Sequence, residues 1–419
     1  MDINVDAGSA PAGPAAAAPG RSGGSLEARL LRRLLSRLGN PPIEFQLLWS
    51  GERIAPLATV PAEHVRIADR ATLLGLLRDP QVRFADAYCA GQIEVEGDLA
   101  KFMVTLFQIF DRAEARESIA SRIAERLRRS RRNTLAGSRD NIHRHYDIGN
   151  DFYALWLGET MAYTCAYYPT AQATLDQAQT AKMDHVCRKL RLGSADSVVE
   201  AGCGWGGLAL HIAARYGAKV RAFNISHEQI DFARRWAQKQ GLQSRVEFIE
   251  DDYRNISGSY DVFVSVGMLE HVGLENYADL GRVMARALKT EGRGLIHSIG
   301  RNRPEPLHPW IERRIFPGAY PPSLGEMMQI FEPAGFSVLD VENIRLHYAL
   351  TLRHWLERYE GAVGAVRSMF DETFVRMWRM YLAGSIAGFE TGTLQLFQVL
   401  FAKQANNAIP LTREYMYPN

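Results

Sequence analysis

The stretch that most constrains the fold of this chain runs from Ser197 to Ile212. A short β-branched run ends at Glu200, and leucines typical of a helix begin at Leu208, with glycines between them at positions 202, 204, 206 and 207. Glycine tolerates positive φ angles and lets a ligand approach the backbone, and the N-terminus of a helix offers unpaired N–H groups. The stretch therefore predicts a strand, a glycine turn and a helix, with a small molecule lying against Gly202–Gly206.

The position of the nearest acid indicates which small molecule the turn binds. A G-x-G-x-x-G pattern alone also fits a dinucleotide site or a tight structural turn. A dinucleotide fold places an acid roughly 20 residues further on, at the tip of the second strand. Here that strand, Ala218 to Phe223, ends in Asn224-Ile225-Ser226, and the acid instead precedes the glycines as Glu200. E-x-G-x-G-x-G with a leading acid resembles the S-adenosylmethionine site of class I methyltransferases.

Regular alternation of apolar strands and helical segments continues after the turn. Further strands are predicted at 246–249, 260–268 and 293–299, with helices between them. This alternation predicts an α/β fold with a doubly wound, Rossmann-like sheet of the class I methyltransferase type, in which ligands lie beyond the carboxyl ends of the strands. Four titratable residues fall at or near those ends: Glu200, Asp252, Glu270 and His297.

Composition places the chain among ordinary globular proteins. The sequence has 419 residues, 47% of them hydrophobic and 23% charged, and four scattered cysteines. These cysteines form neither a disulfide framework nor a C-x-x-C pair for zinc, so we expect no metal and a reducing cytoplasm. Because no apolar run approaches the ~18 residues of a membrane span and no signal peptide is recognisable, any membrane contact is expected to be peripheral.

The sequence divides into four parts. Residues 1–24 are rich in Ala, Gly and Pro and are expected to be a disordered tail. Residues 25–120 predict a small α+β domain that opens with a leucine- and arginine-rich helix. Residues 121–140 predict a basic helix and linker, and residues 141–419 form the predicted catalytic domain.

Arginines dominate the linker region, at positions 122, 126, 128, 129, 131 and 132. A solvated helix face is one interpretation. A segment that binds an anionic membrane surface is another, since each basic residue near such a surface contributes about 1 kcal/mol to the free energy of membrane binding. Nucleic acid is a third, but interleaved aromatic residues and a recognisable nucleic-acid fold are missing, so we expect no nucleic-acid partner.

Several motifs follow one another from Asn141 to the C-terminus. They read N-I-H-R-H-Y-D-I-G-N-D-F-Y, A-Y-T-C-A-Y-Y, E-A-G-C-G-W-G-G-L-A, S-V-G-M-L-E-H-V-G, G-L-I-H-S-I-G and I-F-P-G-A-Y-P-P-S. In this order and spacing they resemble the cyclopropane-fatty-acyl-phospholipid synthase family. Residues 83–99 resemble the N-terminal domain of its phospholipid-acting members, which extends the resemblance over nearly the whole chain outside the tail.

The resemblance implies transfer of the methyl group of S-adenosylmethionine to the double bond of an unsaturated phospholipid acyl chain, followed by closure of a cyclopropane ring. An isolated alkene is a weak nucleophile, so the sulfonium has to be held against it in a dry channel, where aromatic faces stabilise the resulting carbocation. In the family, a bound bicarbonate ion is thought to remove the proton. The matching residues here are Cys165, Glu270, His297, Ile299 and Tyr348.

The same resemblance and the strand ends give the expected cofactor contacts. We expect them from Tyr163, Thr164, Glu200, Gly202, Gly204, Gly206, Asn224, Gln229, Asp252 and Tyr253. Asn224 departs from the acid that many methyltransferases use to bind the ribose, so the ribose is assigned to Asn224 and Gln229. Asp252 and its neighbour Tyr253 are the candidates for the adenine.

Three functional classes remain open at this point. The first is a cyclopropane synthase that acts from the cytoplasm as a peripheral protein on the inner face of the membrane, with unsaturated phospholipid as its partner. The second keeps the cofactor but gives a methyl-branched or methylene product, or methylates a small molecule. The third is a non-catalytic lipid-binding protein, which the intact set of polar residues at the site argues against. A homodimer is expected on the resemblance alone.

Overall fold

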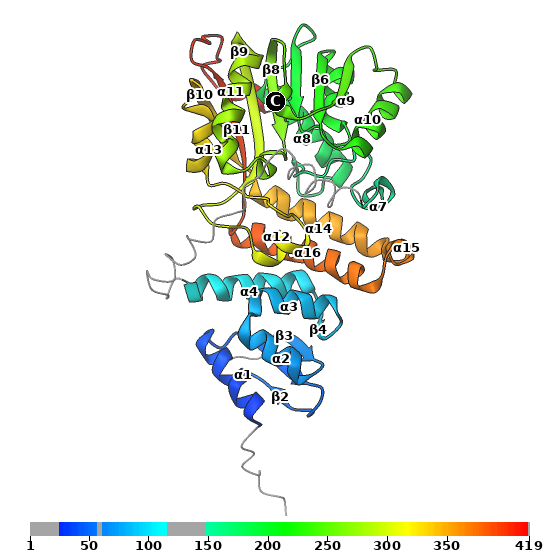
Figure 1. Cartoon of the computed structure of the whole chain (residues 1–419), viewed down its shortest axis with the longest axis vertical. Coiled ribbons are helices and arrows are strands. Elements are labelled where there is room, and N and C mark those ends of the chain that lie inside the picture. Colours follow the sequence, from blue (N-terminus) through cyan, green and yellow to red (C-terminus); the bar gives the residue numbers. More distant parts are fainter. Residues whose placement is uncertain (1–24, 57–60, 115–147, 418–419) are drawn as a thin grey trace, which may run out of the picture.

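The computed structural model describes residues 25–56, 61–114 and 148–417. Figure 1 shows a small N-terminal unit below, a large sheet covered by helices above, and the pair α14 and α16 between them. The predicted tail, the arginine-rich segment and most of the motif that begins at Asn141 lie outside the described residues.

The N-terminal unit is a mixed four-stranded sheet with its helices packed on it. The strands follow the order β2-β1-β3-β4. Their bounds are β1 Ile43–Leu47, β2 Arg53–Ile54, β3 Glu63–Ile67 and β4 Ile93–Glu96, and the helices are α1 Leu26–Arg37, α2 Arg70–Arg78, α3 Pro80–Cys89 and α4 Leu99–Glu114. Local sequence explains where the middle helices begin, because Asp69 and Asp79 cap α2 and α3 through their side chains and Pro80 fills the first turn of α3.

The large sheet confirms the predicted α/β, class I methyltransferase fold. Its seven strands follow the order β10-β11-β9-β8-β5-β6-β7. They span β5 Ser197–Ala201, β6 Lys219–Asn224, β7 Val246–Glu250, β8 Tyr260–Val266, β9 Leu288–Gly300, β10 Phe336–Asn343 and β11 Gln395–Lys403. Only β11 runs antiparallel to its neighbours in this sheet. The glycine turn follows the interior strand β5, which lies between β8 and β6 at the point where the strand order reverses and ligands of such sheets bind.

Helices cover both faces of this sheet. They are α7 Asn150–Ala154, α8 Leu175–Lys189, α9 Gly207–His211, α10 His227–Lys239, α11 Tyr277–Ala287, α12 Pro309–Arg314, α13 Leu324–Phe331, α14 Arg345–Gly361, α15 Val363–Met369 and α16 Glu372–Thr391. Three of them, α12, α14 and α16, lie between the sheet and the N-terminal unit, and we call this layer the waist. Ser226 caps α10 by accepting from the Gln229 N–H. The helix after the glycine turn is shorter than its leucines suggest, because α9 passes into a π-helical turn at Ile212–Tyr216.

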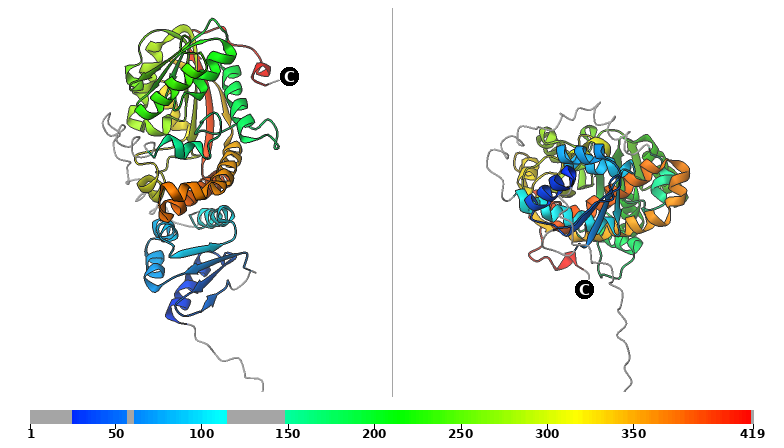
Figure 2. Two further views of the ribbon diagram at one scale, coloured as in Figure 1. Left: turned by 90° about the vertical axis from the view of Figure 1, so that its right-hand side faces the viewer. Right: turned by 90° about the horizontal axis from the view of Figure 1, so that it is seen from below.

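The N-terminal unit docks on the waist through α16 and α12. Arg376 of α16 donates to the Tyr88 and Ile93 carbonyls at 2.5 and 2.9 Å and lies over the Tyr88 ring. Trp310 of α12 donates to Asp86 at 3.0 Å. These contacts place α3 and α4 directly against the waist helices, as the side view in Figure 2 also shows.

Candidate active site

The three glycines of the predicted cofactor turn have different surroundings. All three have positive φ: +79° at Gly202, +54° at Gly204 and +85° at Gly206. A Cβ at Gly202 would lie 2.8 Å from the Met268 side chain, and one at Gly206 would lie 2.5 Å from Phe248. A Cβ at Gly204 would meet no described heavy atom within 4 Å. Gly202 and Gly206 therefore close the turn against the protein, whereas Gly204 faces the open space that a ligand needs.

Glu200 sits at the end of β5 beside this turn, almost completely buried. One of its carboxylate oxygens has no hydrogen-bond partner among the described residues. Burial raises the pKa of Glu200 to about 7, and the nearby Lys182 opposes that rise. A buried carboxylate oxygen without a partner is costly. It fits a ligand that brings positive charge, as the amino and sulfonium groups of S-adenosylmethionine would.

The expected ribose and adenine residues lie around the same turn. Asn224 donates to the Gln229 side chain at 2.7 Å and to the Gly204 carbonyl at 3.3 Å, so these two candidates form one polar group beside Gly204. The Asp252 carboxylate already accepts from the Arg254 backbone and guanidinium. An adenine amine would therefore share Asp252 with Arg254, and the individual cofactor contacts remain predictions.

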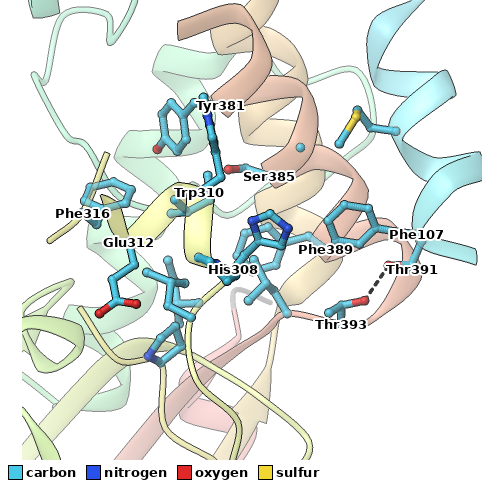
Figure 3. Close-up of a pocket in the computed structure, with 18 of the residues that line it drawn as sticks. Phe107, His308, Trp310, Glu312, Phe316, Tyr381, Ser385, Phe389, Thr391 and Thr393 are labelled. Atoms are coloured by element: carbon cyan, nitrogen blue, oxygen red, sulfur yellow. Dashed lines mark hydrogen bonds between the residues drawn. The ribbon is translucent and has the colours of Figure 1, made fainter. Parts of the chain in front are cut away.

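One cavity of about 970 Å³ brings the predicted catalytic residues together. Cys165, Glu270, His297, Ile299 and Tyr348 all line it, as do the two expected cofactor residues Tyr163 and Thr164. The cavity then extends between the waist and the N-terminal unit, where its wall is apolar. Figure 3 shows part of this wall, with Tyr381, Ser385 and Phe389 from α16 and Phe107 from α4.

The N-terminal unit supplies a share of this wall that the sequence did not predict. Leu31, Leu34, Leu38, Phe45, Leu76, Phe84, Phe102, Met103, Leu106 and Phe107 all line the cavity. Their spacing on the helices is that of ordinary core residues, so no sequence signal separates a cavity wall from a packed core here.

Glu270 follows β8, and one of its oxygens accepts a hydrogen bond from the Ile299 backbone N–H at 2.6 Å. Its other oxygen has no partner among the described residues. Burial raises the pKa of Glu270 to about 7, and the Ile299 N–H partly opposes this rise. An anion that used the Ile299 N–H would have to displace Glu270, so in this structure Ile299 serves to orient Glu270.

His297 lies inside β9, and its ring is oriented from the neighbouring strand. The Gln398 amide donates to Nδ1 at 3.1 Å, which places the ring proton on Nε2. Nε2 has no partner within the described part of the chain. Burial holds the pKa of His297 well below its ordinary value, so the ring is neutral. His297 therefore offers an unused N–H donor at the cavity.

The segment that carries Tyr163, Thr164 and Cys165 is held from two helices. Gln179 and Lys182 of α8 donate to the Thr164 carbonyl and hydroxyl at 2.8 and 2.9 Å. Thr351 of α14 accepts from the Ala166 N–H at 3.0 Å. Burial raises the pKa of the Cys165 thiol well above its ordinary value, so Cys165 stays protonated and is a poor nucleophile. No sequence pattern points to these supporting residues.

Comparison with known proteins agrees with this geometry. Residues 134–399 match the family model described as mycolic acid cyclopropane synthetase. A probable fatty acid methyltransferase of Pseudomonas putida is 36% identical over 88% of this chain and 95% of its own length. The chain belongs to the mycolic acid cyclopropane synthetase family. It is therefore a class I S-adenosylmethionine-dependent methyltransferase.

Two further relatives show how far the family likeness extends. The cyclopropane-fatty-acyl-phospholipid synthase of Escherichia coli (strain K12) is 37% identical over 64% of this chain and 69% of its own length. The solved mycolic acid cyclopropane synthase CmaA1, complexed with SAH and CTAB, has a TM-score of 0.60 and 27% identity. That likeness covers 63% of this chain and 98% of CmaA1.

The open space at Gly204 leads to a test of the cofactor site. Gly204→Asn should weaken binding of S-adenosylhomocysteine by about 100-fold, or about 2.7 kcal/mol, because the side chain occupies the place of the ligand. Asparagine tolerates the left-handed backbone conformation, so the fold should persist. The matched control is Gly241→Asn, at φ +69° with no described atom within 4 Å of the added Cβ.

Calorimetric titration should give wild-type affinity for the control variant, and thermal unfolding should show that both variants fold. A Gly204→Asn protein that binds S-adenosylhomocysteine as tightly as wild type would show that the cofactor lies elsewhere. Binding of NADH in its place would show that the turn belongs to a dinucleotide site.

Proposed function

We propose that this protein transfers a methylene group from S-adenosylmethionine to the double bond of an unsaturated fatty acyl chain in a membrane phospholipid, forming a cyclopropane ring. The observation that carries the proposal is the single cavity that joins the polar site at Glu270 and His297 to a long apolar wall. Its volume of about 970 Å³ lies at the upper end of ordinary ligand pockets, roughly 300–1,000 Å³. The name of the Escherichia coli relative supports a phospholipid substrate.

A second candidate keeps the acyl substrate but ends in a methyl-branched or methylene chain. Two relatives favour it by name: the Pseudomonas putida protein is a probable fatty acid methyltransferase, and a Mycobacterium tuberculosis relative at 37% identity is a tuberculostearic acid methyltransferase. The two candidates share methyl transfer and differ in how the carbocation is resolved. Loss of a proton without ring closure gives a methylene branch, whereas a saturated methyl branch needs in addition a hydride from an external donor such as a reduced nicotinamide or flavin.

The cavity can support both stages of the reaction. In the first, the alkene π electrons form a bond to the transferred methyl carbon, the sulfur retains the electrons of the broken bond, and a carbocation remains on the chain. The Tyr348 ring lies at the cavity, stacked on Phe389 at 4.5 Å between ring centroids, where aromatic faces can stabilise positive charge. In the second, the new methyl group loses a proton and its C–H electrons close the ring.

The protein offers hydrogen-bonding groups for a bicarbonate ion, which would supply the base for that proton. Tyr348 and the Nε2–H of His297 can donate to such an ion, and the unpartnered oxygen of Glu270 can accept from its hydroxyl. Cys165 adjoins the same space as a neutral thiol. The unused donor and the unused acceptor fit a small anion that carries one proton.

The test of the proposed function is the product formed from dioleoyl phosphatidylethanolamine vesicles and S-adenosylmethionine. Mass spectrometry should show acyl chains that gain one carbon and two hydrogens, and proton NMR should show ring methylene protons. Glu270→Gln should keep S-adenosylmethionine binding and lose most activity, because it removes the acceptor from the anion site. Wild-type activity should depend on added bicarbonate and rise with pH through about 7 as Glu270 ionises.

Products that carry a methyl or methylene branch without ring protons would favour the second candidate. Activity that is equal in carbonate-free buffer, with Glu270→Gln nearly unimpaired, would overturn the bicarbonate proposal. His297 would then be the first candidate for the base, in the other tautomer, with its proton on Nδ1 and the lone pair of Nε2 toward the cavity. Unchanged acyl chains would overturn the proposed function.

We propose further that the protein acts as a homodimer at the anionic inner face of the membrane, from the cytoplasm. No helix in the described ranges combines the length and apolar character needed to cross a bilayer. Support for surface binding comes from the arginines at positions 122–132, which lie outside the described residues.

Sedimentation with anionic vesicles tests the membrane surface proposal. Binding should weaken as salt rises, because exposed charges are screened within about 8 Å at physiological ionic strength. The paired changes Arg128→Glu and Arg129→Glu should weaken it further. Sedimentation that neither salt nor these changes affect would contradict a membrane contact through this segment.

A further inference from the structure

The cavity crosses from the waist into the N-terminal unit along the contact between α16 and α4. The residues of α16 that line it include Tyr381, Gly384, Ser385 and Phe389. They recur at helical spacing, so they share one face of α16. Figure 3 shows the three side chains of this set on α16, and Phe107 from α4 at the same cavity. Among the four, Gly384 alone has no side chain.

Packing does not explain why residue 384 is a glycine. A glycine inside a helix costs about 1 kcal/mol relative to alanine, so it usually has a reason. The other glycine of α16 has one, because a Cβ at Gly388 would lie 2.9 Å from the Leu394 side chain. Among the described residues, a Cβ at Gly384 would meet only the end of the Met103 side chain, at 3.8 Å. That distance is an ordinary van der Waals contact, so an alanine would fit.

A side chain at position 384 would instead take space from the cavity. Gly384 and Met103 both line the cavity, one from α16 and the other from α4. The rings of Tyr381 and Phe389 flank the glycine along α16 and narrow the space on either side of it. Methionine is unbranched and flexible, so it can move aside for a ligand. The gap between Gly384 and Met103 therefore forms a passage from the waist into the N-terminal unit.

The far side of this passage suits the methyl end of an acyl chain. Of the described lining residues that the N-terminal unit contributes, only Gln81 is polar and none is charged. The charged lining residues belong to the domain of the large sheet, for example Glu270 and Glu312. Burying a polar lipid head among apolar side chains is costly. An acyl chain with its double bond beside Glu270 therefore fits with its methyl end in the N-terminal unit.

We propose that Gly384 determines how many carbons the enzyme accepts beyond the double bond, because the missing side chain lets the methyl end of the acyl chain pass Met103. A chain that ends before Gly384 does not need this passage, whereas a longer one does. The inference rests on the proposed acyl substrate and adds the position at which the cavity selects chain length. It holds for a ring and for a branched product alike, because it concerns only how the chain is bound.

The experiment compares phosphatidylethanolamines that carry two myristoleoyl, two palmitoleoyl or two oleoyl chains. These lipids share the head and the position of the double bond and differ only in the number of carbons beyond it. The Kd of each lipid is measured in a neutral detergent without S-adenosylmethionine, and kcat/KM is measured for methylation. Gly384→Leu should weaken both quantities for the oleoyl lipid about tenfold relative to the myristoleoyl lipid. Gly384→Ala should give a smaller loss in the same order of chain length.

A second substitution tests the passage itself. Met103→Ala in the Gly384→Leu protein should restore the oleoyl lipid, because a shorter side chain opposite the leucine reopens the gap. The matched control is Gly364→Leu, since Gly364 is an exposed glycine of α15 with no described atom within 4 Å of an added Cβ. It should leave the ratio between the lipids unchanged. Leucine is a good helix former, so the variants should fold and bind S-adenosylhomocysteine as wild type does.

Equal losses for the three lipids in Gly384→Leu would assign Gly384 a purely structural role and overturn the inference. A wild-type ratio between the lipids would overturn it as well. If Gly384→Leu does not fold, Gly384→Ala decides, because a loss that grows with chain length supports the passage and a loss without this trend contradicts it. If wild type methylates none of the lipids, the proposed function fails, while the Kd values measured without S-adenosylmethionine still decide for or against the passage.

Discussion

The site depends on one constraint, which is that the Glu270 carboxylate is held inside an apolar cavity by the backbone of the neighbouring strand. β8 and β9 run parallel, and Val266 pairs with His297. This register places Glu270, just after β8, within 2.6 Å of the Ile299 N–H. The bond fixes one oxygen of Glu270 and leaves the other for a ligand, while burial raises the pKa of the carboxyl to about 7. A weaker or shifted strand pairing would lose this orientation.

Residues of β11, α8 and α14 and the N-terminal unit support that arrangement. Gln398 of β11 fixes the tautomer of His297, and Lys182 and Thr351 hold the segment around Cys165. The N-terminal unit then encloses the apolar end of the cavity, anchored to the waist by Arg376. Water exclusion and orientation thus come from parts of the chain that are far apart in sequence, which is what a reaction through a carbocation requires.

Much of the fold and the reacting centre could be predicted because their signals are local. Glycines at positive φ, an acid before them and polar residues at strand ends are all visible in the sequence, and the structure brings the predicted catalytic set to one cavity. The predicted bounds of the strands were less accurate. β9 begins at Leu288, earlier than the predicted 293, because strand pairing extends through a polar stretch that has no apolar pattern. The direction of β11 depends on tertiary packing alone.

What the sequence could not show depends on contacts between distant residues. Gln398 lies in a long apolar strand, and only its register opposite His297 reveals its function. The N-terminal residues that line the cavity have the spacing of a normal core, and Ile299 has no side-chain signal for its bond to Glu270.

The central claim is that an acyl chain lies in this cavity with its double bond beside Glu270. The most direct measurement is a crystal structure of the protein with S-adenosylhomocysteine and an oleoyl phospholipid. The account predicts a chain that passes Tyr348 and Glu270 and continues along the apolar wall toward Phe107 and Met103, with the cofactor sulfur facing the double bond. A chain bound outside this cavity, or a cofactor whose sulfur faces away from it, would contradict the account.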